Sequence, residues 1–139
     1  MATDSTSARK TTVLLVDDES AITLLFEMDL TRRGYCVLKA HSASEAIKMS
    51  EDFQTPVDVL VADWKMPDMT GDELACLLWK QQPEMKLILI SGYSSAAAKI
   101  AGFPRNQVAF AQKPLSPSKL NSMIKEILRT AGPFRTHAA

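Results

Sequence analysis

Residues 13–18 read VLLVDD, four consecutive apolar residues followed directly by two aspartates. A short apolar run bounded by polar residues is typical of a strand that is buried on both faces, as the strands of parallel sheets are. Three later runs have the same form, and they lead into Asp63, Ser91 and Lys113. Because the carboxyl ends of parallel strands lie at one edge of a sheet, the sequence predicts that carboxylates, a hydroxyl and an amine converge there.

Helical patterns alternate with these apolar runs. The expected strands are 12–16, 35–39, 57–62, 86–90 and 107–111, and the expected helices are 20–33, 42–52, 71–82, 95–101 and one that begins near Pro117. Ser42 is a candidate N-cap with Glu45 in capping-box spacing, whereas Gly102 and Pro104 cut the fourth helix short. This alternation predicts one doubly wound α/β domain, with helices on both faces of a five-stranded parallel sheet.

Length and composition limit the class of protein. The chain has 139 residues, the size of one domain, and its sixteen acidic side chains balance sixteen Lys and Arg. Zero formal charge provides no field that would favour nucleic-acid binding. Residues 1–10 lack the apolar core of a signal or membrane span, so we expect a cytoplasmic protein with a disordered N-terminal tail, one domain over 11–131 and a short C-terminal tail over 132–139. Cys36 and Cys76 lie in apolar patterns and are expected to be buried, reduced thiols.

Three carboxylates are expected to crowd at the predicted sheet edge. Asp17 and Asp18 follow the first strand, and Asp63 follows the third, which can lie beside the first in a doubly wound sheet. Either aspartate of the pair could by itself be a helix cap. Three close carboxylates, however, oppose one another's ionisation unless a cation offsets them, and oxygen ligands suit Mg²⁺. The sequence therefore predicts a divalent metal site.

The same edge carries groups suited to phosphoryl transfer. A carboxylate beside Mg²⁺ can act as a nucleophile toward phosphorus while a lysine offsets the charge on the phosphoryl oxygens. Asp63 is the candidate nucleophile, and Lys113 is the candidate counter-charge. The hydroxyl of Ser91 could donate a hydrogen bond to a phosphoryl oxygen, which makes this residue a candidate sensor of the transferred group.

Four motifs carry a resemblance to a known family. In chain order they are VLLVDDES (13–20), VADWKMPDMTGDEL (61–74), LILISGYS (87–94) and VAFAQKPLSPSKL (108–120). The acidic pair, the D-x-x-M-P turn, the strand-end serine and the K-P dipeptide together resemble the receiver domains of two-component response regulators, in particular single-domain chemotaxis regulators. The resemblance covers the predicted domain and implies a flavodoxin-like fold with strand order 2-1-3-4-5.

The resemblance also implies a function. Asp63 would accept a phosphoryl group from a phosphohistidine on a histidine kinase or a histidine phosphotransfer protein. Asp18 and the backbone carbonyl of Lys65 would bind Mg²⁺ together with the phosphoacceptor, and Asp17 would help through water. The domain would signal to a downstream protein as a switch that assists its own phosphorylation and dephosphorylation, and it would not be an enzyme that turns over a substrate. No nucleic acid or membrane partner is implied, and the expected state is a monomer or weak dimer.

Two further features concern the switch. In such domains the aromatic residue three positions before the lysine changes orientation as the serine or threonine moves toward the phosphoryl group, so Ser91 and Phe110 inherit a coupled switch role. Lys65 departs from the family pattern, because its ammonium could meet the phosphoryl group or an attacking water; the lifetime of the phosphorylated state stays open. The brief fourth helix also leaves open whether the usual signalling surface, built from the fourth helix, fifth strand and fifth helix, is used.

The first predicted helix has two interpretations. Ile22, Leu25 and Phe26 form an expected core stripe, and Leu24 and Met28 belong to a second apolar strip. Receiver domains commonly dock their histidine partner near this helix, so we hypothesise that the second strip contacts that partner. The alternative is a helix that is broadly buried.

The sequence leaves other functions open. The chain could be a receiver excised from a hybrid histidine kinase, or a degenerate receiver that binds partners without phosphorylation, although the complete set of site residues argues against the second. A dehalogenase-like Mg²⁺-dependent phosphatase also forms an aspartyl phosphate. Such enzymes carry a D-x-D pair after the first strand, however, where this chain has Asp17-Asp18-Glu19.

Overall fold

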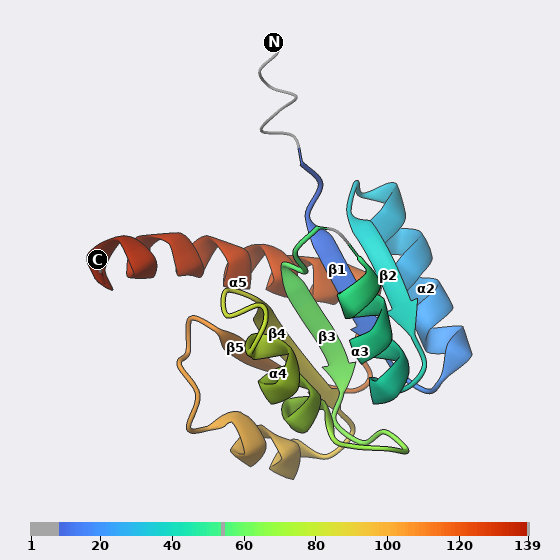
Figure 1. The fold of residues 1–139 in the computed structure, drawn as a ribbon. Helices are drawn as coiled ribbons and strands as arrows, with labels where there is room; N and C mark the ends of the chain where they lie inside the picture. Colours follow the sequence, from blue (N-terminus) through green and yellow to red (C-terminus); the bar gives the residue numbers. More distant parts are fainter. Residues whose placement is uncertain (1–8, 54, 139) are drawn as a thin grey trace.

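A five-stranded parallel sheet forms the centre of the computed structural model, which describes residues 9–53 and 55–138, with side chains as far as Arg129 (Figure 1). The strands lie in the order β2-β1-β3-β4-β5. Their bounds are β1 Thr12–Val16, β2 Cys36–Ala40, β3 Val59–Asp63, β4 Lys86–Ser91 and β5 Val108–Gln112. The predicted fold class and strand order are therefore confirmed.

Helices cover both faces of the sheet (Figure 1). They are α2 Ser20–Arg32, α3 Ala43–Asp52, α4 Gly71–Trp79, the 3₁₀ helix η1 Ser94–Ile100, and α5 Pro117–Ala138. Buried side chains of α2 and α5 pack on one face, while those of α3, α4 and η1 pack on the other. The short fourth helix is confirmed, and its 3₁₀ geometry fits a segment followed closely by Gly102 and Pro104.

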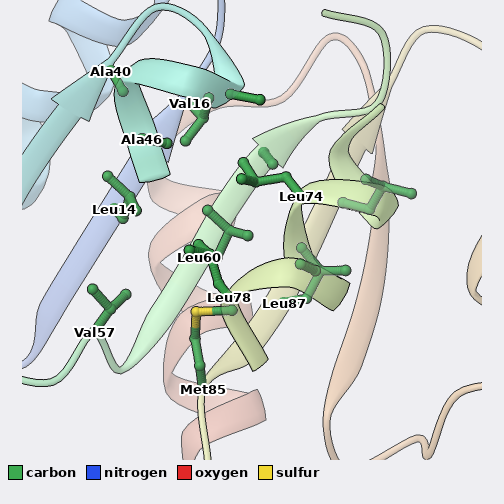
Figure 2. Packing of buried hydrophobic residues seen from close by; sticks show 14 of the residues in the cluster. Leu14, Val16, Ala40, Ala46, Val57, Leu60, Leu74, Leu78, Met85 and Leu87 are labelled. Carbon is green, nitrogen blue, oxygen red and sulfur yellow. The ribbon is translucent and has the colours of Figure 1, made fainter. Parts of the chain in front are cut away.

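Successive strand residues alternate between these two faces, because the side-chain period of a strand is two. Leu14, Leu60 and Leu87 point toward α3 and α4, where they meet Leu74 and Leu78 of α4 (Figure 2). The next residue of each of these strands belongs to the cluster beneath α2 and α5; these residues are Leu15, Val61 and Ile88. Burial of each such leucine contributes about 1.5–3 kcal/mol, so both faces stabilise the sheet that carries the site.

Several boundaries differ from the prediction for local reasons. β3 begins at Val59, two residues later than predicted, because Val57 N donates to the side chain of Gln82 and not to a neighbouring strand. β3 also includes Asp63 as its last residue. α4 ends at Trp79 because bonds of the i→i−3 type, such as Gln81 N to Leu78 O at 3.1 Å, tighten the chain before Pro83.

Two predictions of burial are wrong. Leu25 is 55% exposed, because Phe26 and Leu30 turn the buried side of α2 away from it. Cys76 is exposed on α4, whereas Cys36 is half-buried, and both thiols are free. Gly34, predicted to end the first helix, has φ of 106° just after α2 and so adopts the left-handed conformation that glycine permits.

The ends of the chain add two observations. Residues 1–8 of the expected N-terminal tail lie outside the described residues, and Arg9 forms an ion pair with Asp58 at 2.9 Å. α5 runs to Ala138, through most of the expected C-terminal tail. In the part of the chain that the structure describes, no helix combines the length and apolar character needed to cross a membrane.

Candidate functional site

Three carboxylates meet at the carboxyl edge of the sheet. Asp17 and Asp18 directly follow β1, and Asp63 ends the neighbouring strand β3. One oxygen from each of the three lies within 4.8 Å of the others. The side chains of Asp17 and Asp63 are only 10% and 12% exposed, whereas Asp18 faces solvent. The structure thus brings together the three acids that the sequence placed at this edge.

Lys113 extends from the end of β5 into this acidic cluster. Its Nζ lies 3.3 Å from Asp63 Oδ2, 3.6 Å from Asp17 Oδ2 and 3.6 Å from Glu19 Oε1. The backbone of Lys113 is held beside the end of β4, because Lys113 N donates to Ser91 O at 2.8 Å. The peptide bond between Lys113 and Pro114 is cis. Sequence reasoning missed Glu19 as a partner of this lysine, although it directly follows the acidic pair.

The electrostatics of the cluster follow from burial. Burial raises the pKa of Asp17, against hydrogen bonding from Glu19 N and the charge of Lys113. Burial likewise raises the pKa of Asp63, and the charge and hydrogen bond of Lys113 offset it only in part. Burial works to lower the pKa of Lys113, but the surrounding carboxylates outweigh it, so the pKa is raised and the side chain stays charged.

The donor set fits a hard divalent cation. The single ammonium of Lys113 does not fully offset the cost of burying the charged carboxylates of Asp17 and Asp63. Three convergent carboxylate oxygens are ligands that Mg²⁺ prefers. Asp17, Asp18 and Asp63 could therefore hold the ion. Lys65 follows β3 in an exposed loop and pairs with Thr70 through an isolated antiparallel bridge, so its backbone belongs to the same rim.

The predicted sensor and its aromatic neighbour lie on β4 and β5. Ser91 is buried as the last residue of β4, one position beyond the strand partner of Asp63. Its Oγ accepts a hydrogen bond from Tyr93 N at 3.0 Å. Phe110 is half-buried on β5 and packs against the core cluster on the face covered by α3 and α4. Ser91 lies at the carboxyl end of β4, and by the strand alternation it lies on the same face of the sheet as Leu89, the register partner of Phe110.

Aromatic rings and lysines line the rim next to the phosphoacceptor candidate. Trp64 contacts Tyr93 edge to face, with ring centroids 6.5 Å apart. Lys65 Nζ lies 5.7 Å from the centre of the Tyr93 ring, and Lys99 Nζ lies 5.7 Å from that of Trp64. The Lys65 ammonium is therefore stabilised by an aromatic face. Sequence reasoning missed Tyr93 and Lys99, because both contacts are tertiary.

The surface beside the site is apolar. A hollow of about 340 Å³ lies between α2 and the segment after β5, and it is lined by Ile22, Phe26, Ile90, Lys113, Pro114 and Leu115. On α2 itself, Leu24 and Met28 are 49% and 64% exposed. The broadly buried helix considered from the sequence is therefore ruled out, and an uncovered apolar strip of Leu24, Leu25 and Met28 remains.

Comparison with known proteins gives consistent matches. A family model, the response regulator receiver domain, matches residues 13–125. The chain is 39% identical over 122 residues to the sensor kinase CckA of Brucella abortus, which covers 84% of this chain and 12% of that protein. It is 32% identical over 117 residues to the alkaline phosphatase synthesis transcriptional regulatory protein PhoP of Bacillus subtilis, covering 84% of this chain and 48% of PhoP. The chain thus spans less than half the length of these two relatives.

Solved structures agree with the sequence matches. A CheY-like receiver domain protein from Methanospirillum hungatei superposes with a TM-score of 0.77 at 31% identity, covering 88% of this chain and 97% of that one. The receiver domain of the hybrid histidine kinase CckA gives a TM-score of 0.66 at 28% identity, covering 84% and 98%. These matches give no support to the dehalogenase-like phosphatase considered from the sequence.

Proposed function

The chain belongs to the receiver domain family of response regulators, and from this membership we propose that Asp63 accepts a phosphoryl group from a phosphohistidine in a magnesium-dependent reaction. Receiver domains are phosphorylatable signalling switches, and they take their phosphoryl group from histidine kinases. One observation carries the assignment to Asp63: its carboxylate receives the Lys113 ammonium at 3.3 Å while it shares the cluster with Asp17 and Asp18.

In the proposed reaction, an oxygen of Asp63 attacks the phosphorus as the P–N bond to the donor imidazole breaks and the electron pair returns to the ring. Mg²⁺, held by Asp17, Asp18, Asp63 and the Lys65 carbonyl, would supply charge neutralisation at the phosphoryl oxygens. Lys113 already lies where negative charge develops and needs no rearrangement to meet it. The product is an aspartyl phosphate on the last residue of β3.

The proposed switch follows from the resting hydrogen bond of Ser91. Its hydroxyl accepts from Tyr93 N, and in the proposed switch the hydroxyl moves toward Asp63 and donates to a phosphoryl oxygen. Space vacated on this side would allow Phe110 to change orientation, and the new surface would signal to a downstream protein. Sequence identity to the sensor kinase CckA favours, as a second candidate, the receiver of a hybrid histidine kinase acting by the same chemistry. In both cases we expect a cytoplasmic domain that is a monomer or weak dimer.

Intact mass spectrometry tests the phosphoacceptor. The protein is incubated with acetyl phosphate with and without Mg²⁺. We expect the gain of one phosphoryl group, dependent on the ion and absent from Asp63→Asn. A modification that survives in Asp63→Asn, or no gain with any phosphodonor, contradicts the proposal.

The exposed strip on α2 is the proposed dock for the histidine partner. Leu24 and Met28 lie on the same helix as Ile22 and Phe26, which line the apolar hollow beside Lys113. Leu24→Asp should slow transfer from a cognate phosphohistidine protein while phosphorylation by acetyl phosphate is unchanged. Leu77→Asp is the matched control, because Leu77 is 41% exposed on α4, over the other face of the sheet. Equal transfer rates in the two variants would reject the dock.

A further inference from the structure

The loop between β3 and α4, residues 64–70, is closed at its base. Gly71 N donates to Trp64 O at 2.9 Å, and Lys65 pairs with Thr70. Glu73 Oε1 accepts from Thr70 N at 3.0 Å and completes the capping box of α4. These bonds close the base of the loop, and Trp64 N donates to Ile90 O of β4 at 2.8 Å, but none of them reaches Asp68 in the outer part of the loop.

Asp68 joins the outer part of this loop to another helix. Its Oδ1 accepts from Ala43 N at 3.1 Å, and its Oδ2 accepts from Ser44 N at 2.9 Å. Figure 1 shows the start of α3 at the same end of the sheet as the loop after β3. The hydrogen bond from Ser44 N, with that from Ala43 N, lowers the pKa of Asp68. A charged carboxylate therefore faces the positive end of the α3 dipole.

The N–H groups at the start of a helix have no partner within it. In α3 these groups donate to two different acceptors outside the helix. Ser42 Oγ accepts from Glu45 N, and Ser42 O accepts from Ala46 N. Ser42 thus accepts from the third and fourth N–H groups of the helix, and Asp68 accepts from the first two. The loop and the helix are therefore tied by two charge-assisted bonds across 24 and 25 positions of sequence.

The other side of this tie leads to the acidic cluster. The turn that starts α3 follows β2, and the last residue of β2, Ala40, accepts a hydrogen bond from Asp17 N at 3.2 Å. A short series of contacts thus runs from Asp68 through the start of α3 to Asp17. It connects the loop that carries Lys65 with the segment that carries Asp17 and Asp18.

We propose that Asp68 is a positioning residue for magnesium. It holds the loop against α3 and so keeps the Lys65 carbonyl in the position, relative to the carboxylates of Asp17, Asp18 and Asp63, from which all four groups can bind one ion. Asp68 is not a member of that cluster and would not touch the ion. The inference rests on the proposed function, because it needs Mg²⁺ to bind there.

Isothermal titration calorimetry with MgCl₂ tests the proposal in wild type, Asp68→Ala and Asp68→Asn. Residues that orient metal ligands typically change metal affinity by about tenfold or more, and we expect a loss of this size in Asp68→Ala. Asp68→Asn should recover part of the loss, because its one carbonyl oxygen can still accept one of the two N–H groups. Ser42→Ala is the matched control: it removes a cap from the same helix and leaves the tie intact, so it should lower the melting temperature with little change in Mg²⁺ affinity.

Loss of charge needs its own control, because removing any nearby carboxylate weakens attraction for a cation. The titrations are repeated at about 1 M KCl, where the screening length is only about 3 Å, and with Asp72→Asn, a charge removal at the start of α4 that makes no bond to α3. A loss that persists in high salt and exceeds that of Asp72→Asn supports positioning. If wild type binds Mg²⁺ and Asp68→Ala binds it equally, or Ser42→Ala loses as much, the inference is overturned while the proposed function stands. If wild type itself fails to bind Mg²⁺, the proposed function falls as well.

Discussion

Gly71 is the residue at which a single methyl group should disturb both the fold and the site. A Cβ added there would lie 2.7 Å from the backbone oxygen of Asp63, 2.8 Å from Leu89 Cδ1 and 3.2 Å from Ala62 Cβ. Leu89 and Ala62 are fully buried, so neither has free space to move into. Overpacking of this kind costs about 1–3 kcal/mol, and alanine returns less than about 1 kcal/mol through its better helix propensity.

We therefore expect Gly71→Ala to be destabilised by about 1–2 kcal/mol, which corresponds to a melting temperature lower by roughly 3–10 °C for a domain of this size. The displaced atom is the carbonyl of Asp63 itself, so phosphorylation by acetyl phosphate should also slow at temperatures where the variant is fully folded. Thermal denaturation followed by circular dichroism gives the first quantity, and phosphoryl incorporation followed by mass spectrometry gives the second.

Gly102→Ala is the control for this experiment. A Cβ at Gly102 would meet nothing within 4 Å, and its backbone does not have the positive φ of Gly34. Its stability should stay within about 0.5 kcal/mol of wild type. Should Gly71→Ala melt and react as wild type does, the close approach between α4 and the end of β3 would not constrain the site, and the reasoning would be refuted.

Other predictions follow from the charges and the packing. Asp17→Asn removes one of the crowded carboxylates, so it should raise the melting temperature in EDTA, and saturating Mg²⁺ should reduce this advantage by stabilising wild type more. The pKa of Asp68 is lowered in the folded state, so its contribution to stability is present above the ordinary pKa of about 3.9 and is lost as pH falls through the lowered value. The difference in urea midpoint between wild type and Asp68→Asn should accordingly shrink in acid, and a constant difference would contradict it. Phe26→Ala should cost about 3–5 kcal/mol, whereas Leu25→Ala should stay within about 0.5 kcal/mol, as measured by urea denaturation.

The strand ends could be predicted because the buried parallel strands consist of continuous apolar runs. The polar residue that follows each run marks the end of the strand. On that basis the sequence predicts that Asp17, Asp63 and Lys113 lie together at one edge of the sheet. What the runs could not supply are contacts between segments that are distant in sequence. Asp68 contacts the start of α3, and Tyr93 contacts Lys65. Both are tertiary contacts, so the local sequence pattern does not predict them.

Helix α2 shows a different limit. Apolar spacing placed Leu25 in the core of α2, but two polar residues occupy buried positions instead. Thr23 satisfies its hydroxyl by donating to Ser20 O at 3.0 Å, and Asp29 is paired with Arg33 at 2.7 Å. Because these side chains find partners within the helix, burial is cheaper for them than their polarity suggests, and the buried stripe rotates away from Leu25.

The three acidic contacts of Lys113 imply that Lys113 and Ser91 act at different stages, before and after the phosphoryl group arrives. An ammonium already fixed among Asp17, Glu19 and Asp63 loses almost no freedom when a phosphoryl group arrives. The hydroxyl of Ser91, in contrast, accepts from Tyr93 N in this structure, and its O–H can be directed at a phosphoryl oxygen only after that group has arrived. Substitutions of Lys113 should therefore change the rate at which Asp63 is phosphorylated. Substitutions of Ser91 should change the response of the domain to the phosphoryl group.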